Sequence, residues 1–282
     1  MTGRLDFASS TDNDAKGMAQ TAKVVQLNPG TLQAFDAYVR SAEAQSEKML
    51  RDERPFLWCD TPERMRALRQ GGIAVELLSG QSAVKVPGGL IHDWVGAVLI
   101  PAVSMEQTLT LVQDYDHHKI IYQPEVIESA LRSRQGNEFQ IYLRLLKKKV
   151  ITVVLDTDHQ VHYLPLEATR WLCRSCTTRI AEVENAGTRN EEVLPPDTGH
   201  GFLWRLNSYW RFQQKEEGVY VECRAISLTR DIPLGLGWLI EPIIRKLPGE
   251  SLAHTLEATR EALQRSSGRD PGNRSNRKRP AR

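Results

Sequence analysis

The sequence predicts an α+β fold in which a curved antiparallel sheet of about seven strands grips a long C-terminal helix, with a helical extension at the N-terminus. Three observations predict this fold. Apolar and polar residues alternate with a period of two through most of residues 126–228, as in half-buried strands. The segments between these runs are short, which indicates antiparallel neighbours. An apolar stripe at helical spacing follows at 250–265, and a helix of that kind needs an apolar surface to cover.

The N-terminal part of the chain is predicted to hold a leader and two helices. Residues 1–28 are polar and aperiodic, which is typical of a flexible leader. From Thr31 apolar residues recur at spacings of three and four, which predicts an amphipathic helix that ends before Pro55. A Thr-Pro-Glu sequence at 61–63 is a typical helix start, so a second helix follows. Residues 29–74 are therefore predicted to form an N-terminal helical extension.

The sheet is predicted to begin at the apolar segment 90–100, after a Gly-Gly pair. A helix start at Ser104 predicts two helices that run to Tyr122 and interrupt the strands once. The further strands are predicted at 126–134, 138–146, 150–156, 160–166, 170–183, 202–213 and 219–228. Segment 232–240 is too rich in Gly and Pro for a strand and too apolar to be exposed, so we expect it to pack at one end of the sheet. The predicted folded domain spans residues 84–265.

Positive charge is concentrated at the C-terminus. The last 18 residues hold six Arg, one Lys and one Asp, a net charge of +6, which leaves −4 on the rest of a chain whose total is +2. A body with that balance has no positive field to hold nucleic acid, so no specific nucleic-acid partner is expected. Residues 266–282 are predicted to be a disordered basic tail. Two interpretations of the tail stay open: a solubilising segment, or a weak contact with an anionic membrane surface.

The sequence contains no signal for export or membrane insertion. No stretch approaches the roughly 18 consecutive apolar residues of a membrane helix. The first 14 residues carry Asp6, Asp12 and Asp14, where a signal peptide needs a basic start and an apolar core. Four cysteines are too few for a disulfide framework. A cytoplasmic location is therefore expected.

Strand alternation predicts one apolar face turned toward the C-terminal helix. In segment 202–212 the even-numbered residues, from Phe202 to Phe212, belong to that face. With apolar residues of the other strands and of the helices they form a predicted ligand-binding floor. The candidate ligand-binding residues are Tyr122, Phe139, Ile141, Leu143, Trp204, Leu206, Ser208, Trp210, Val221, Cys223, Trp238, Leu252 and Leu256. A packed core explains any one of them, and the pocket interpretation applies to the set.

The opposite face of the predicted sheet carries charged residues. They are Arg144, Arg205, Arg211, Glu222 and Arg224. A half-exposed sheet normally alternates in this way, so we expect a cross-strand lattice of ion pairs on a solvated surface rather than an anion site.

No arrangement typical of catalysis or metal binding stands out, so catalytic residues stay unknown and neither a cofactor nor a metal is expected. The histidines are scattered, and the pair His117-His118 follows Asp114 and Asp116 on a helix, where adjacent side chains diverge by about 100° and cannot converge on one ion. The Cys-x-x-Cys at 173–176 lies in a predicted strand, which puts its two thiols on opposite faces. Signatures of serine hydrolases, NTPases, dehydrogenases and zincins do not occur.

Three segments carry a family resemblance. They are GFLWRLNSYWRF at 201–212, GVYVECRAISLTRDIP at 218–233 and the following GLGWLIEP. Together with the order of elements over about 84–265, they resemble bacterial members of the START-like helix-grip superfamily, which includes polyketide cyclases and coenzyme-Q-binding proteins. A long helix laid on a strongly curved sheet cannot fill its concave side completely, so a cavity is expected.

The resemblance implies binding or transport of a hydrophobic small molecule, such as a lipid, a quinone or an isoprenoid, in that cavity. An alternative is a polyketide cyclase/aromatase-like or dehydratase-like enzyme in which Ser208, Tyr122 or His92 guides proton transfer. A third reading makes the N-terminal helices an interaction module, although packing on the sheet explains their apolar stripe more simply. The polar segment 185–201 is either a lid or the disordered end of a hairpin.

Overall fold

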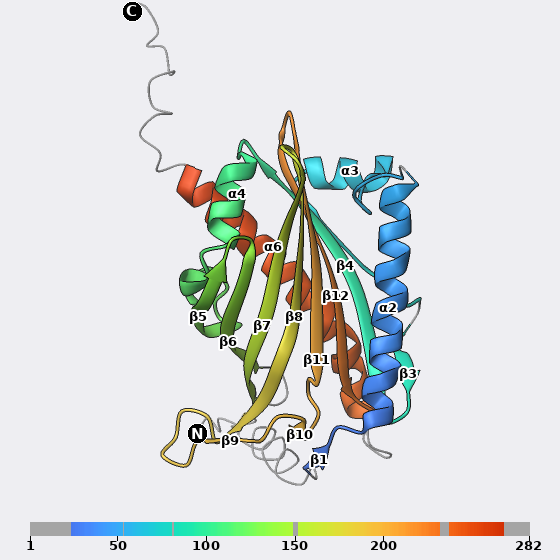
Figure 1. The fold of residues 1–282 in the computed structure, drawn as a ribbon, viewed down its shortest axis with the longest axis vertical. Helices are drawn as coiled ribbons and strands as arrows, with labels where there is room; N and C mark the ends of the chain where they lie inside the picture. Colours follow the sequence, from blue (N-terminus) through green and yellow to red (C-terminus); the bar gives the residue numbers. More distant parts are fainter. Residues whose placement is uncertain (1–23, 53, 81, 149–151, 232–236, 268–282) are drawn as a thin grey trace, which may run out of the picture.

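The computed structural model describes residues 24–52, 54–80, 82–148, 152–231 and 237–267, with 237–245 described as backbone alone (Figure 1). The helices are α2 (Pro29–Arg51), α3 (Pro62–Arg69), α4 (Met105–Val112), α5 (His118–Ile121) and α6 (Gly237–Ser267), with a 3₁₀ turn η1 (Tyr115–His117). The strands are β1 (Val25–Gln26), β2 (Ile73–Leu77), β3 (Val84–Val86), β4 (Gly89–Pro101), β5 (Val126–Gln135), β6 (Glu138–Lys148), β7 (Thr152–Glu167), β8 (Arg170–Glu184), β9 (Glu192–Val193), β10 (Thr198–Gly199), β11 (Arg205–Lys215) and β12 (Gly218–Arg230).

One large antiparallel sheet dominates the fold. Its strands follow the order β2-β4-β12-β11-β8-β7-β6-β5, while the short strands β3 and β9 pair with β4 and β8. The ribbon of β1 and β10 is separate from it. The sheet curves around α6, which runs along its concave side (Figure 1). The predicted fold class is therefore confirmed, and the long strands β4, β5, β6, β7, β8, β11 and β12 give the predicted number of about seven.

Several element boundaries differ from the sequence-based prediction. The polar residues between 156 and 160 suggest a turn, but β7 continues through them with a bulge between Asp158 and His159, because β6 and β8 supply hydrogen-bond partners on both sides. The predicted split into two strands is wrong. The sheet also begins earlier than expected, at β2, whose five residues are too few for alternation to be recognised. The last helix starts at Gly237, within the segment expected to pack irregularly, of which 232–236 lie outside the described residues.

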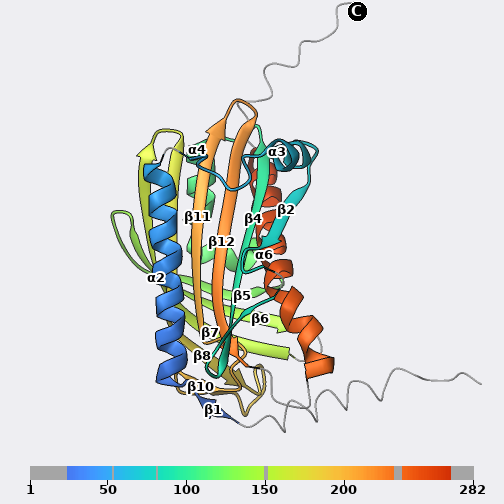
Figure 2. The same ribbon diagram turned by 90° about the vertical axis from the view of Figure 1, so that its right-hand side faces the viewer.

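Different helices cover the two faces of the sheet (Figure 2). On the concave face, Leu252, Leu256 and Leu263 of α6 join the largest buried cluster. On the other face, Phe35 and Val39 of α2 pack in a separate cluster with residues of β4 and β12. A third cluster joins α3 and the segment before it to the same outer face. The apolar stripe of α2 is thus explained by packing on the sheet.

Polar anchors accompany this packing on the outer face. The Tyr38 hydroxyl donates to Asp93 at 2.8 Å, and Asp93 forms an ion pair with Arg224 at 2.6 Å. Further along α2, the guanidinium of Arg211 donates to Ser46 Oγ at 2.6 Å. Because α2 and segment 54–61 cover this region, the predicted solvated lattice is wrong for Arg211 and Glu222. Glu222 is only 4% exposed.

Elsewhere on the outer face, Arg144 of β6 forms a cross-strand ion pair with Asp156 of β7 at 2.7 Å, as predicted. Arg205 pairs instead with Asp197, at 2.6 Å, outside the strands of the sheet. Asp197 belongs to the long segment between β8 and β11, the one for which a lid or a disordered hairpin end is predicted. In the structure this segment contains β9 and β10 and is tied to the neighbouring strands.

Candidate functional site

Short side chains line the middle of the concave face. The antiparallel register aligns residues of neighbouring strands in rows that cross the sheet. The clearest row runs through Trp94, Ala225, Ser208, Ser175 and Val161. Its three central side chains reach only a short way toward α6, whereas Trp94 at one side is large. The row on one side contains Gly96, Cys223, Trp210, Cys173 and Tyr163. The row on the other side contains His92, Ser227, Leu206 and His159.

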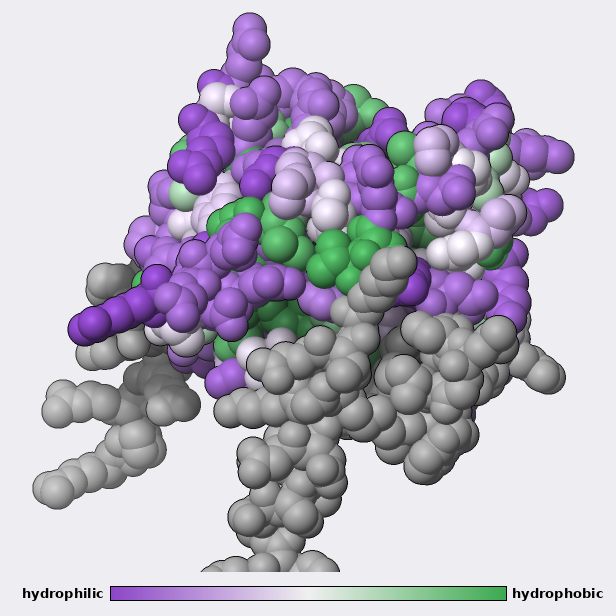
Figure 3. Space-filling view, turned by 90° about the horizontal axis from the view of Figure 1, so that it is seen from below, coloured by the Kyte–Doolittle hydropathy of each residue, from purple (hydrophilic) through white to green (hydrophobic). Residues whose placement is uncertain are grey.

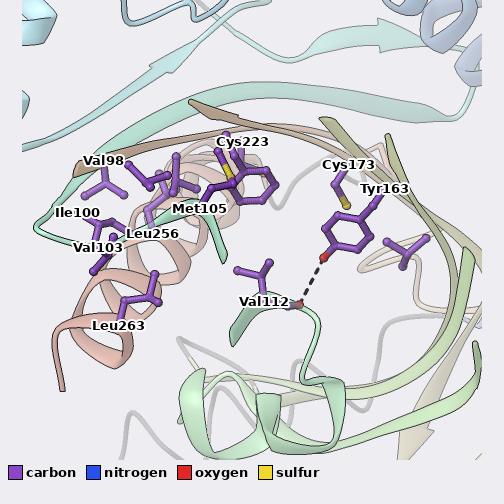
Figure 4. Close-up of a cluster of buried hydrophobic side chains, with 14 of the residues drawn as sticks. Val98, Ile100, Val103, Met105, Val112, Tyr163, Cys173, Cys223, Leu256 and Leu263 are labelled. Carbon is purple, nitrogen blue, oxygen red and sulfur yellow. Dashed lines mark hydrogen bonds between the residues drawn. The ribbon is translucent and has the colours of Figure 1, made fainter. Parts of the chain in front are cut away.

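One end of the concave face is closed by a packed apolar core. Side chains of β4, α4 and α6 meet there, as do those of β7, β8 and β12 (Figure 4). The Tyr163 hydroxyl lies 3.0 Å from that of Tyr115 and 3.4 Å from the backbone oxygen of Val112. Phe139 packs edge-on against both tyrosine rings. At this end, therefore, the described side chains of the sheet, α4 and α6 are packed against one another.

The rest of the concave face is only partly covered. Leu206, Ser208 and Trp210 of β11 and Leu143 of β6 are half-buried, although they face the side on which α6 lies. Figure 3 shows the end of the molecule opposite the packed core, where apolar side chains lie at the centre of the view between polar ones. Apolar side chains that stay partly accessible beneath a covering helix indicate a surface that α6 does not fill.

A histidine that the sequence analysis missed lies on this face. His159 is 5% exposed, with Nε2 at 2.9 Å from Thr157 Oγ1 and Nδ1 at 3.4 Å from Ser175 Oγ. Thr157 donates its single hydroxyl proton to the Leu143 carbonyl at 2.9 Å, so toward His159 it can only accept. We therefore assign the proton of the neutral ring to Nε2, which leaves Nδ1 as an acceptor. Burial lowers the pKa of His159 to about 4, and the ring is neutral at pH 7.

Two more polar groups occupy the side of the face formed by β4. His92 is 1% exposed, its Nε2 lies 3.0 Å from Thr229 Oγ1, and burial lowers its pKa to about 4. The indole Nε1 of Trp94 is buried and has no hydrogen-bond partner among the described residues. An unpaired buried donor costs roughly 1 to 3 kcal/mol, so this N–H marks a place where an acceptor is expected.

The structure places ten of the candidate residues on or opposite the concave face. Those on the concave face or on α6 opposite it are Phe139, Ile141, Leu143, Leu206, Ser208, Trp210, Val221, Cys223, Leu252 and Leu256. Tyr122, at the end of α5, is buried beside α6, and its hydroxyl lies 3.2 Å from Thr259 Oγ1. Trp238 falls among the residues whose side chains are not described.

The prediction that Trp204 lies on the concave face is wrong. It packs with Phe35, Ile91 and Leu228 in the cluster under α2, on the other face of the sheet. The alternation begins only at Arg205, where β11 starts, and the chain before it turns away. Phe202, predicted to share the concave face, is 37% exposed and stacks on His200 instead.

The remaining sequence motifs do not form a site. Cys173 faces the core and Cys176 the outer face, as predicted for a Cys-x-x-Cys in a strand, and both are free thiols. His117 pairs with Asp114 at 2.8 Å on the surface, whereas His118 is buried against the Val112 carbonyl. Within the described part of the chain no three His, Cys, Asp or Glu side chains gather as metal ligands do.

The sheet order and the last helix define the fold. The protein has the helix-grip architecture: a curved antiparallel sheet closed on one long C-terminal helix. No protein-family model matches the chain, and no curated protein does. None of the described helices has the length and apolar character needed to cross a membrane.

Several solved structures are similar. A STAR-related lipid transfer protein fragment from Xanthomonas axonopodis is 18% identical, with a TM-score of 0.45, over 65% of this chain and 98% of that one. The Zhui aromatase/cyclase from Streptomyces sp. R1128 is 10% identical, with a TM-score of 0.45, over 63% and 96%. Human STARD10 is 12% identical, with a TM-score of 0.43, over 75% and 84%. These similarities are low, so the fold assignment rests on the sheet order and on α6.

Proposed function

We propose that the protein binds or transports a hydrophobic small molecule, such as a lipid, a quinone or an isoprenoid, between the concave face of the sheet and α6. One observation carries the proposal: Leu206, Ser208 and Trp210 stay half-buried on a face that a long helix covers. A packed core would bury them. A mostly apolar surface with a few convergent polar groups is typical of small-molecule sites, and this face has both.

The state of the polar groups favours binding without chemistry. The Tyr122 hydroxyl is engaged by Thr259, and burial raises its pKa to about 12, so it is a poor acid at pH 7. His92 is 1% exposed and its low pKa keeps it neutral. One observation favours the alternative, a cyclase/aromatase-like or dehydratase-like enzyme: His159 presents an unprotonated Nδ1 beside the Ser175 hydroxyl. A carrier releases its ligand unchanged, whereas such an enzyme releases a product of different structure.

Filling the middle of the concave face should abolish binding. Ser208→Trp places an indole in the row of short side chains, next to Trp210 of the neighbouring row. There it would occupy the space proposed for the ligand. We expect the wild type to bind pyrene, an uncharged fluorophore without hydrogen-bonding groups, and Ser208→Trp to bind it at least tenfold more weakly. Fluorescence titration measures both affinities.

The matched control is Ser133→Trp. Ser133 is exposed on β5 and lies opposite Gln140, away from the concave face, so this variant should bind pyrene as the wild type does. Urea unfolding of each variant verifies that the fold is retained. Native mass spectrometry of the purified wild type, followed by extraction, would identify any molecule that co-purifies. A wild type that binds no pyrene and carries no small molecule would contradict the proposal.

We also propose a weak membrane contact through the basic tail, in a protein located in the cytoplasm. Residues 268–282 lie outside the described part of the chain, and their charge alone supports the contact. We expect the full chain to sediment with phosphatidylserine vesicles at about 20 mM salt and to dissociate at about 300 mM, because screening weakens such attraction. A chain ending at Ser267, which keeps all of α6, should stay unbound. Equal sedimentation of both chains would refute the contact.

A further inference from the structure

We propose that the ligand carries an uncharged oxygen, a hydroxyl or a carbonyl group, at the middle of the concave face, that Ser208 donates a hydrogen bond to this oxygen, and that Ser175 accepts one from it where it is a hydroxyl. This inference rests on the proposed function and narrows it. It separates alcohols, ketones and quinone-like molecules from fatty acids and phospholipids.

The two hydroxyls form a pair on neighbouring strands. Ser208 of β11 is directly opposite Ser175 of β8, and Cβ atoms of such pairs lie about 4.5 to 5.5 Å apart. Both residues are half-buried. The Ser208 hydroxyl forms no hydrogen bond with any described residue, while Ser175 has only the 3.4 Å contact with His159. Two under-used hydroxyls on an apolar face are therefore available to one ligand atom.

The proton arrangement around His159 determines which of these hydroxyls can donate a hydrogen bond to a ligand and which can accept one. Because His159 donates its Nε2 proton to Thr157, Nδ1 is an acceptor, and Ser175 donates its proton toward it. The lone pairs of Ser175 then remain free to accept, and Ser208 remains free to donate. A carbonyl oxygen can accept from Ser208. A hydroxyl can do so and also donate to Ser175.

Charge argues against an ionised head group at this place. Between β4 and β7 the three rows that cross the middle of the face contain no Asp, Glu, Lys or Arg. The first row continues past β7 to Arg134 on β5, which is exposed and stacks on the ring of Phe139. The ammonium of Lys147, on the same strand as Leu143, already contacts the carboxylate of Glu125 and the hydroxyl of Ser251. A carboxylate or phosphate bound beside Ser208 would lose its hydration without gaining a cation, which strongly disfavours it.

The unpaired indole of Trp94 is a second, independent indication. Trp94 lies in the same row as Ser208, separated from it by Ala225. Its Nε1 is a buried donor without an acceptor among the described residues. It adds a neutral donor and no charge to this side of the face.

The experiment measures displacement of pyrene by two probes with the same ten-carbon chain, 1-decanol and decanoate. We expect 1-decanol to displace pyrene at a concentration at least tenfold lower than decanoate. In Ser208→Ala and Ser175→Ala, the affinity for 1-decanol relative to that for pyrene, both measured in the same variant, should fall about fivefold, as expected for one neutral hydrogen bond. Ser133→Ala removes an exposed hydroxyl from β5 and should change neither value.

The outcomes separate this inference from the proposed function. If pyrene does not bind the wild type, the hydrophobic site itself is refuted and this inference with it. If pyrene binds but decanoate competes as well as 1-decanol, the site is supported and the uncharged-oxygen inference is overturned. The inference is also overturned if both serine variants, shown by urea unfolding to be folded, bind 1-decanol relative to pyrene as tightly as the wild type.

Discussion

Asp93→Ala is expected to lower the free energy of unfolding by about 3 to 5 kcal/mol, the loss typical of a broken buried ion pair. Asp93 is fully buried on the outer face and accepts from Arg224 Nε at 2.9 Å and from its terminal nitrogen at 2.6 Å. It also accepts from Tyr38 of α2 at 2.8 Å. Removal of the carboxylate leaves the partly buried guanidinium of Arg224 without its counter-charge. Urea unfolding followed by tryptophan fluorescence measures the change.

Two control variants separate the ion pair from its surroundings. Tyr38→Phe removes one hydrogen bond to Asp93 and is expected to cost about 1 kcal/mol. Glu128→Ala breaks an exposed ion pair with Lys119 and should cost less than about 1 kcal/mol. A loss below about 1 kcal/mol for Asp93→Ala would show that water reaches Arg224 and that α2 does not seal the outer face.

Strand alternation predicted most of the fold and most of the concave face. The rule works where a strand is long and regularly paired, as in β6, β11 and β12, and it correctly placed Phe139, Ser208 and Val221. It failed where pairing overrides local composition. Residues 156–160 are polar enough for a turn, yet pairing on both sides keeps them in β7, so His159 went unrecognised.

Trp204 shows a second reason for failure. Alternation holds only inside a strand, and the chain before Arg205 is shaped by a tertiary contact. The carboxylate of Glu182, on β8, accepts the backbone N–H groups of His200 at 2.7 Å and Gly201 at 2.8 Å. Gly201 itself has a φ of +79°, which favours glycine. No local pattern reveals such a contact between residues 18 or more apart in sequence.

The outer face could not be assigned from alternation because two interpretations share one pattern. Charged residues on alternate positions indicate a solvated face, but the same positions suit polar anchors for a covering helix. The distinction depends on where α2 docks, which strand periodicity does not contain. Arg211 and Glu222 therefore looked exposed in the sequence, whereas α2 and segment 54–61 cover them.

Glu222 makes the stability depend on pH. Burial raises the pKa of its carboxyl to about 7, although the nearby Arg211 and the backbone N–H of Cys59, 3.2 Å from Oε2, oppose the shift. Between pH 4.5 and 7 the folded protein keeps a proton that the unfolded chain has lost. The contribution of Glu222 to the unfolding free energy is therefore full below pH 4.5, falls as pH rises through this window and is constant above it.

Glu222→Gln should remove this dependence, because the amide imitates the protonated acid and does not titrate. Raising the pKa from 4.5 to about 7 corresponds to about 3 kcal/mol. We expect the variant to equal the wild type at pH 4 and to be more stable by about 3 kcal/mol at pH 8, measured by urea unfolding across this range. Glu216→Gln, at an exposed position of the β11–β12 turn, should leave the curve of the wild type unchanged. Equal stability of Glu222→Gln and the wild type at pH 8 would mean that the buried carboxylate ionises at no cost, and the segment 54–61 would then have to admit water to it.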